Sequence, residues 1–588
     1  MRKRAQGRGR RSGPRERSVR YVSLLVGLAA LLVGLGGRLV WLQLVAGPAY
    51  AQAALDQRNR EIVIPPQRGS IYDREGEPLA VTMAARTIYA VPPTVVDPDG
   101  AASALAAILG GDAESYRAKL TKDSSFAYIA RKVDVERADA VEALGLAGIY
   151  SQEDFRRVYP SNELACQVLG FVGVEDTGLE GIELQYESVL HGAPGMLIAE
   201  KGIGGYPIPG GVTLEEPAVH GQNVVLTIDK DIQYEAHMAL LEAVETWGAK
   251  GGSVLIMDPD TGALLAAASA PAFDPNTYST ADAKARRLSA LADTYEPGST
   301  IKSLTAAAVI EEKLFTPDSM FQLPSTLKVG GRTIKESHSR APVTWSLTQI
   351  VTNSSNVGAV KLGMALGEQR LYDYFAAFGL TEKTGVDFPG EAVGWLPPPS
   401  QWSASSIGNI PFGQGVSVTP LQLLRANAAI ANGGELVTPH FLASLPDSPE
   451  QAVTWPKKRV ISADTAEQMR RVMKAVVEEG TGDAARVEGY AVAGKTGTAQ
   501  KARTDGRGYA QGKYVGSFCG FLPADDPAVI ILVSLDEPSK AIYGGTVAAP
   551  TFARLGAYCM RHLKIPPVVA GTQASDAPVT EDSQARGN

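Results

Sequence analysis

Cysteine and histidine are scarce in this chain, whose 588 residues include three cysteines and six histidines. Cys166, Cys519 and Cys559 are scattered along the sequence and are too few for the disulfide framework of a small secreted domain. The histidines are also dispersed, so neither residue type shows the spacing of a metal site. No serine lies in a G-x-S-x-G turn, which carries the nucleophile of α/β-hydrolases. These absences argue against a zinc enzyme or a Ser-His-Asp hydrolase, and we expect neither a metal nor a cofactor.

Extremes of composition are absent as well. Hydrophobic residues make up 45% and charged residues 20% of the chain, which is ordinary for a folded protein and excludes a chain that is disordered throughout. The length exceeds what one hydrophobic core usually serves, so we expect two or three domains.

Positive and negative charges are unevenly distributed. The formal net charge is -7, yet nine of the first twenty residues are Lys or Arg, against a single acidic residue, Glu16. This arm therefore carries +8, which leaves -15 for the rest of the chain. A basic arm is compatible with a nucleic-acid-binding tail, but the segment that follows favours another interpretation.

An uncharged stretch at 21–37 follows the arm, and the apolar character resumes after Arg38. At a rise of about 1.5 Å per residue, the segment 21–45 is long enough to span a membrane with Arg38 reaching the interface. The upstream basic residues place the arm in the cytoplasm, so the rest of the chain should lie outside. Residues 49–51 (A-Y-A) resemble a signal-peptide cleavage site, but the apolar segment is longer than a signal core. We therefore expect an uncleaved, single-pass anchor in the cell membrane.

The region after the anchor mixes short strands and helices. A polar segment of helical character at 49–60 precedes residues 67–80, which show a strand-turn-strand pattern with Glu75-Gly76 as the turn. We find no catalytic cluster between these residues and about residue 217. At the other end of the chain, from residue 566, Pro, Ala, Ser, Thr and Asp dominate, which predicts a disordered tail.

The second half of the chain predicts a sheet covered by helices. Asp229 is placed to cap a helix that runs to about Trp247, and another helix is expected at 549–563. Strand patterns occur at 224–228, 253–258, 263–269, 491–500, 515–523 and 528–535. A long, mostly helical insert separates 253–269 from the last three strands, so we expect one antiparallel sheet of about five strands.

These patterns indicate an α+β fold class and five segments. We expect a cytoplasmic basic arm at 1–20, a transmembrane helix at 21–45, a mixed α/β pedestal at 46–220, the sheet domain at 221–565 and a disordered tail at 566–588.

A candidate nucleophile lies in the segment 295–302 (Y-E-P-G-S-T-I-K). Pro297-Gly298 makes a turn, and the Ala-rich stretch that follows predicts a helix starting near Ser299. Ser299 and Lys302 then lie on one face, a turn apart, as a hydroxyl beside a possible base. A second S-x-x-K at 325–328 runs into a predicted hairpin, so we do not assign it a catalytic role.

Two further motifs follow in the same order. Ser354 and Asn356 form the only S-x-N, ahead of a helical segment, and Lys495-Thr496-Gly497 ends a predicted strand. Another K-T-G at 383–385 has no strand before it. Singly, these residues have ordinary explanations as helix caps, a solvated lysine or strand residues of high β propensity. Jointly, the set S-x-x-K, S-x-N, K-T-G resembles the serine penicillin-recognising enzymes.

The resemblance extends over nearly the whole chain. The anchor, the segment 68–80, the segment 178–183 and the segment 412–422 are together similar to class B penicillin-binding proteins, whose pedestal is a dimerisation-type domain. The segment 412–422 is closer to the cell-division type than to the elongation type, and a sporulation type would look much the same. The resemblance implies a peptidoglycan D,D-transpeptidase that acts in septal wall synthesis and is a β-lactam target.

The resemblance also implies catalytic roles. Ser299 would attack the D-Ala-D-Ala amide of a stem peptide and form an acyl-enzyme. Lys302 would accept the proton, which requires burial and a nearby cation such as Lys495 to lower its pKa by several units. Ser354 would pass the proton to the leaving nitrogen.

Substrate-binding roles fall on other residues of the second and third motifs. Asn356 would hold the substrate amide, while Thr496 and Thr498, with Lys495, would receive the terminal carboxylate. The backbone N–H groups of Ser299 and Thr498 would form the oxyanion hole. Gly497 would let the strand lie against the substrate backbone.

The implied partners are stem peptides, β-lactams, the cytoplasmic membrane, a lipid II polymerase of the SEDS class and other division proteins. Nucleic acid is not an expected partner. A D,D-carboxypeptidase or β-lactamase is an alternative, but no acidic motif for activating water lies between the second and third motifs. A catalytically inactive scaffold or a penicillin sensor is another, although the arm of twenty residues is short for a signalling domain.

Overall fold

The computed structural model describes residues 14–50, 53, 59–201, 207–503 and 508–567. It forms two compact units, Met1–Pro66 with Ala193–Val219, and Gln67–Gly192 with His220–Asn588. The first thirteen residues of the predicted arm and residues 568–588 of the predicted tail lie outside the described residues.

The first unit contains the predicted anchor. Helix α1 (Pro14–Val40) continues into a π-helical turn, η1 (Trp41–Val45). Within the 28 residues Ser18–Val45, a stretch of 18 residues has a mean hydropathy of 2.0, and none of that stretch is buried. This helix is therefore long and apolar enough to cross a membrane. The predicted span 21–45 lies within it.

A small antiparallel sheet completes the first unit. Its strands are β1 (Asn59–Ile64), β8 (Gly195–Lys201) and β9 (Pro207–Glu216), with β8 in the centre. The predicted polar helix at 49–60 is wrong at its end, because Asn59 and Arg60 pair with β8. Most of the remainder of that helix lies outside the described residues.

The pedestal part of the second unit is built on the long strand β3 (Pro78–Ala90), which pairs with β2 (Ile71–Tyr72), β4 (Ala127–Asp134) and β5 (Ile149–Val158). The predicted turn at Glu75-Gly76 is confirmed. Asp73 Oδ1 accepts from the N–H of Glu75 and Glu77, and Gly76 has a φ of +88°.

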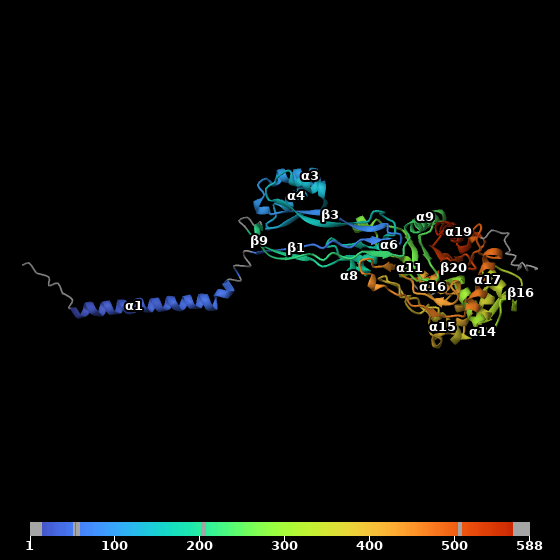
Figure 1. Cartoon of the computed structure of the whole chain (residues 1–588). Helices are drawn as coiled ribbons and strands as arrows, with labels where there is room; N and C mark the ends of the chain where they lie inside the picture. The colour runs from blue at the N-terminus through green and yellow to red at the C-terminus, as the bar shows by residue number, and fades with distance from the viewer. Residues whose placement is uncertain (1–13, 51–52, 54–58, 202–206, 504–507, 568–588) are drawn as a thin grey trace, which may run out of the picture. The chain divides into compact units, whose positions relative to one another are not determined.

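Three helices cover one face of this sheet, α3 (Pro98–Leu109), α4 (Ala113–Leu120) and α5 (Val135–Glu142), and Figure 1 shows α3 and α4 beside β3. Ile88 and Ile129 from the strands and Leu105 and Val141 from the helices are buried together. Alternate residues of β3 and β4 point to the same face of the sheet, and this is the face that packs against the three helices.

The pedestal sheet also takes strands from the second half of the chain. Strand β10 (Val224–Leu226) lies parallel to β2, and β18 (Leu442–Ser444) pairs with β10. The predicted strand at 224–228 is thus present in part. This sheet contains strands from both sides of the expected domain boundary between residues 220 and 221. Backbone hydrogen bonds therefore join the pedestal to the catalytic part of the chain.

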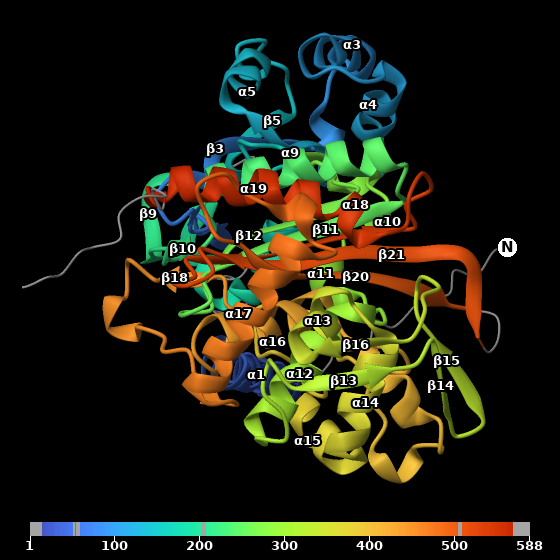
Figure 2. The same cartoon turned by 90° about the vertical axis from the view of Figure 1, so that its right-hand side faces the viewer.

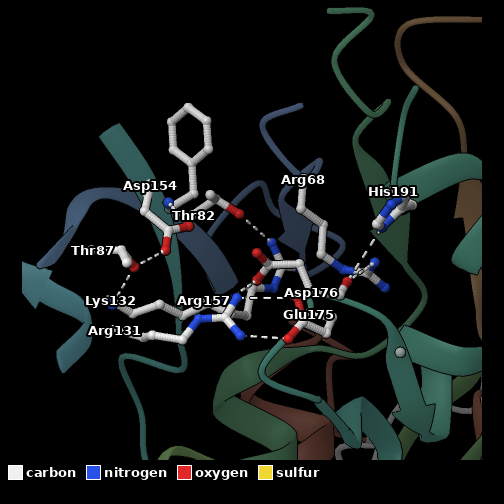
Figure 3. A network of polar contacts seen from close by, with 12 residues as sticks. Arg68, Thr82, Thr87, Arg131, Lys132, Asp154, Arg157, Glu175, Asp176 and His191 are labelled. Atoms are coloured by element: carbon white, nitrogen blue, oxygen red, sulfur yellow. Dashed lines mark hydrogen bonds and ion pairs between the residues drawn. The ribbon is translucent and has the colours of Figure 1, made fainter. Parts of the chain in front are cut away.

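A buried ion cluster joins the two pedestal segments that resemble the family. Glu183 in α7 (Gly181–Gln185) is fully buried and accepts from Arg68 Nε and Arg157 Nε, each at 2.7 Å. Figure 3 shows Arg68 and Arg157 in this network, where Arg157 Nη1 also donates to Thr82 Oγ1 at 3.0 Å. Such a cluster holds strands and helix together because the loss of one partner would leave a buried charge unpaired.

The predicted five-stranded antiparallel sheet is confirmed. Its order is β12 (Leu264–Ala270), β11 (Gly251–Met257), β22 (Val529–Asp536), β21 (Tyr509–Leu522) and β20 (Ala493–Ala502). Strand β21 begins six residues before the predicted start at 515. β20 is an edge strand, so one of its sides is free for other contacts.

Helices cover both faces of this sheet. The predicted helices form as α9 (Lys230–Trp247), capped by Asp229, and α19 (Ala549–His562). Figure 2 shows them on one side of the sheet and α12 (Lys302–Glu311), α14 (Asn356–Leu366) and α16 (Pro420–Ala431) on the other. Val254 and Ile256 pack toward α9 and α19, whereas Leu255 and Met257 pack into the core of the insert.

The helix predicted to start near Ser299 begins three residues later. Gly298–Ile301 forms a 3₁₀ turn, η4, and α12 starts at Lys302. Gly298 has a φ of +55°, and its N–H donates to the carbonyl of Gly413 at 3.1 Å. This left-handed residue, pinned by a distant loop, tightens the chain before the helix.

Both alternative motifs lie in the structures that the sequence predicts. Thr326–Val329 and Arg332–Lys335 form the hairpin β14–β15, which begins just after Ser325. Residues 383–385 are not in a strand, and Thr384 Oγ1 donates to Glu391 Oε1 at 2.5 Å, which gives this threonine a structural partner.

Candidate active site

The three motifs, far apart in sequence, line one cleft of about 830 Å³. The walls include Gly298 and Ser299 from η4, Asn353, Ser354 and Asn356 from the second motif, and Thr496 and Thr498 from β20. The cleft lies where the edge strand β20 meets the helical insert. The expected convergence of the motifs is therefore present in the structure.

Ser299 sits in the turn η4, half-buried at the cleft wall. Its backbone is fixed from both sides: Thr300 Oγ1 donates to the Pro297 carbonyl at 2.7 Å, and a Cβ on Gly413 would lie 2.1 Å from the Gly298 carbonyl oxygen. Only glycine at 413 permits this close approach. The loop thus holds the turn against the cleft.

Lys302 is 1% exposed, and its Nζ donates to three oxygens. These are the Ser354 carbonyl at 2.6 Å, Asn356 Oδ1 at 2.8 Å and Ser354 Oγ at 3.3 Å. Burial lowers the pKa of Lys302 well below its ordinary value, and the nearby Lys495 lowers it further, against an opposing effect of Glu336. The lowered pKa that the resemblance requires of Lys302, with burial and Lys495 as its causes, agrees with this environment.

The Ser299 hydroxyl has no hydrogen-bonding partner in the described part of the chain, and no hydrogen bond joins it to Lys302, the base that the resemblance implies. The reason lies in the lysine: all three donor positions of its Nζ are directed at Ser354 and Asn356. Loss of one proton would free a lone pair on Nζ for a new partner.

Lys495 on β20 is completely buried. Its Nζ donates to Ser354 Oγ at 3.1 Å and to the carbonyl and hydroxyl oxygens of Thr496, both at 3.2 Å. Burial lowers the pKa of Lys495 to about 7. The Ser354 hydroxyl therefore lies between two buried amines, with the cleft on its open side.

Ser354 adopts a backbone that serine rarely occupies. Its φ is +55°, between α13 (Leu347–Thr352) and α14, and such a conformation costs on the order of 1 kcal/mol or more. Ser355 caps α14 and accepts from Gly358 N at 2.9 Å. The kink turns both the carbonyl and the hydroxyl of Ser354 toward Lys302.

Glu336 is a residue of the site that the sequence analysis missed. Its side chain is 7% exposed, and it accepts from the Asn356 N–H and the Ser355 hydroxyl, each at 2.6 Å. Arg340 Nη2 donates to the same carboxylate at 2.5 Å. A carboxylate at the start of α14 is favoured by the helix dipole and fixes the second motif in place. The only local sequence feature that points to Glu336 is Arg340, four residues later. A pair of opposite charges at this spacing is too common to identify a site residue.

The third motif presents two hydroxyls to the cleft. Thr496 Oγ1 lies 2.8 Å from Thr481 Oγ1, and Thr498 Oγ1 accepts from the Gly544 N–H at 3.1 Å. Because Thr498 uses a lone pair for Gly544, its own hydrogen is free to donate into the cleft. Thr481, like Glu336, was not singled out from the sequence.

Gly497 has a different steric role from the one predicted. A Cβ at this position would lie 2.4 Å from Ser517 Oγ and 2.8 Å from Thr300 Cγ2, not in the open cleft. The missing side chain therefore lets β20 pack against η4, the turn that carries Ser299. Glycine here sets the distance between the first and third motifs.

Two protein-family models match the chain, one described as the penicillin binding protein transpeptidase domain over residues 252–556 and one as the penicillin-binding protein dimerisation domain over 63–226. Stage V sporulation protein D of Bacillus subtilis is 36% identical over 538 residues, covering 90% of this chain and 83% of that protein. Peptidoglycan D,D-transpeptidase FtsI of Escherichia coli is 32% identical over 554 residues, covering 92% of this chain and 91% of that protein. The crystal structure of penicillin binding protein 3 from Mycobacterium tuberculosis, complexed with aztreonam, has a TM-score of 0.68 and 31% identity, covering 86% of this chain and 98% of that chain.

Proposed function

Because the chain belongs to the class B penicillin-binding proteins and is a peptidoglycan D,D-transpeptidase, we propose that Ser299 is its acylating nucleophile. One observation carries the assignment. The hydroxyl of Ser354 receives hydrogen bonds from the two buried amines, Lys302 and Lys495, in the same cleft that Ser299 lines. A buried amine of lowered pKa is available as a base at neutral pH.

In the first step, Ser299 Oγ attacks the carbonyl carbon of the penultimate D-Ala while its proton passes to the neutral Nζ of Lys302. Lys302 returns a proton to Ser354 Oγ, which lies 3.3 Å away, and the Ser354 hydroxyl gives its own proton to the nitrogen of the terminal D-Ala. The C–N bond breaks as that nitrogen is protonated. The products are an ester on Ser299 and free D-Ala.

In the second step, the amine of a neighbouring stem peptide attacks the ester. The proton of this amine travels the same route in reverse and restores the Ser299 hydroxyl, and the new amide is the cross-link. Covalent reaction with a β-lactam follows the first step only, because the opened ring stays attached and blocks the acceptor.

The remaining motif residues bind the acyl donor. Asn356 holds the substrate amide, and Lys495, Thr496 and Thr498 receive the terminal carboxylate through one buried cation and two hydroxyls. The backbone N–H groups of Ser299 and Thr498 stabilise the oxyanion, and each such donor is typically worth about 10²- to 10³-fold in rate. Gly497 supports this arrangement indirectly through its packing against η4.

For the cellular role, we favour septal wall synthesis, with a sporulation- or elongation-type role as the alternative. The apolar helix Ser18–Val45 would anchor the chain with its basic arm in the cytoplasm and the catalytic domain outside. A SEDS-class lipid II polymerase and other division proteins are the proposed partners. Depletion in the native host tests the role: filaments with incomplete septa support division, whereas rounded cells or blocked spores contradict it.

Labelling with a fluorescent penicillin tests the nucleophile. Ser299→Ala should abolish the covalent label, while Ser325→Ala, the exposed serine of the alternative S-x-x-K, should keep it. A donor substrate supplied with and without an acceptor amine then tests the reaction. Amide product in the presence of amine supports a transpeptidase, and hydrolysis that turns over in seconds regardless of amine contradicts it.

A further inference from the structure

Thr481 joins the third motif from a different part of the chain. It follows α17 (Ala463–Glu479), lines the cleft and is exposed to it. Its N–H donates to the carbonyl of Thr352 at 3.4 Å, and a Cβ on Gly545 would lie 2.6 Å from its carbonyl oxygen. The backbone around Thr481 is thus held between the end of α13, which directly precedes the second motif, and the segment after β22.

The surroundings of the Thr496 hydroxyl restrict where its hydrogen can point. A threonine hydroxyl has one hydrogen and two lone pairs. Lys495 Nζ lies 3.2 Å from Thr496 Oγ1 and can only donate to it, while Thr481 Oγ1 lies 2.8 Å away and can donate or accept. Two hydroxyls and an amine therefore share one chain of hydrogen bonds that ends in the cleft.

An anion in the cleft decides in which direction these hydrogen bonds are donated. A carboxylate is a stronger acceptor than a neutral hydroxyl, so the Thr496 hydrogen turns toward it. Thr496 Oγ1 then has two lone pairs left, one for Lys495 and one for Thr481. In that arrangement Thr481 donates, and it blocks the orientations in which the Thr496 hydrogen points away from the ligand.

We propose that Thr481 is a positioning residue that aims the Thr496 hydroxyl at the terminal carboxylate of the acyl donor. The inference rests on the proposed function, because it assigns that carboxylate to Thr496. It adds a residue outside the three motifs and predicts that Thr481 matters only for ligands that carry the negative charge.

Acylation by a penicillin with a free carboxylate, and by the methyl ester of the same penicillin, separates charge recognition from structural damage. Thr481→Val keeps the shape but removes the hydroxyl. It should slow acylation by the acid about 10- to 100-fold, the usual range for losing a hydrogen bond to a charged group, because the bond from Thr496 to the carboxylate is then no longer aimed. Acylation by the ester should change less than about threefold, since the ester lacks that charge. Thr481→Ser should retain most of the wild-type rate with both.

Two further variants complete the test. Thr546→Val removes another exposed threonine of the same cleft, whose hydroxyl bonds to no described residue, and should leave both rates unchanged. In a Thr496→Val background, Thr481→Val should add little, because the residue through which it acts is gone.

The outcomes distinguish the inference from the proposed function. Equal losses for acid and ester, no loss in Thr481→Val, or additive losses in the double variant would overturn the role of Thr481 while leaving Ser299 as the nucleophile. A wild-type protein that forms no covalent adduct with either penicillin would overturn the proposed function itself.

Discussion

Lys302 and Lys495 donate to the same oxygen, Ser354 Oγ, at 3.3 and 3.1 Å. Both ammonium groups are buried, so two full charges at this separation would repel each other with little screening from solvent. The site can relieve this repulsion by holding one proton fewer. That state supplies a neutral base for Ser299 beside a cation for the substrate carboxylate.

The acylation rate should depend on pH in a bell shape. The proposed reaction needs Lys302 neutral, so the rate rises with pH through the pKa of Lys302, which burial and Lys495 place well below its ordinary value. It also needs Lys495 protonated, so the rate falls above about pH 7. Stopped-flow acylation by a fluorescent penicillin measures both limbs. A rate that climbs steadily to pH 10 would mean that Lys302 is an ordinary, charged lysine.

Lys495→Met should abolish acylation and yet stabilise the fold. The pKa of Lys495 is about 7 in the folded chain and near 10.4 when unfolded, so between these values the unfolded chain binds more protons. The resulting cost is full below pH 7 and fades as the pH rises. Replacing a buried charge by an apolar side chain is expected to gain about 1 to 4 kcal/mol.

Thermal unfolding checks this gain. The melting temperature of Lys495→Met should exceed that of the wild type at pH 7 and by less at pH 10. Lys328→Met, in the exposed hairpin strand β14, is the matched control and should show no such gain. A melting temperature of Lys495→Met below that of the wild type at pH 7 would show that the cation contributes to stability rather than opposing it.

Glu336→Gln should shift the acid limb of the pH–rate profile to lower pH. The Glu336 carboxylate raises the pKa of Lys302, so its neutral amide lets that pKa fall further. The variant should also lose activity about tenfold, since the bonds to the Asn356 N–H and the Ser355 hydroxyl lose their charge assistance. Glu312→Gln, at the far end of α12, should change neither property. An acid limb that moves upward would contradict the assigned sign.

Gly497→Ala should impair acylation by displacing β20 from η4. The new methyl group would meet Ser517 Oγ at 2.4 Å and Thr300 Cγ2 at 2.8 Å, and overpacking of this kind typically costs about 1 to 3 kcal/mol. Ser517→Ala in the same chain should recover part of the loss, because it removes the nearer atom. Acylation kinetics and denaturant unfolding report the two effects. Wild-type values for Gly497→Ala would place this position away from η4.

The strands and helices could be predicted where the sequence pattern is local. Alternation along Gly251–Met257 places Val254 and Leu255 on opposite faces, and Asp229 is a typical N-cap directly before α9. The start of α12 was predicted three residues too early. The cause is a bond from Gly298 to Gly413, which no local pattern indicates.

The site residues could likewise be predicted only where a short sequence motif carries them. Order and spacing of the motifs selected Ser299 and Lys302 over the alternative S-x-x-K at 325–328, whose hairpin was also foreseen. Glu336 and Thr481 were not found, because each acts through a contact with another element of the fold. These contacts join residues 20 and 15 positions apart, which no local periodicity marks. The role of Gly497 was misjudged for the same reason: its neighbours Ser517 and Thr300 belong to other elements.

Mass spectrometry of the full chain after incubation with penicillin identifies the acylated serine. We expect one adduct per chain, mapped after trypsin digestion to the peptide 288–302, which contains Ser299 and ends at Lys302. An adduct on the peptide 314–328, which contains Ser325, or no adduct at all, would contradict this expectation.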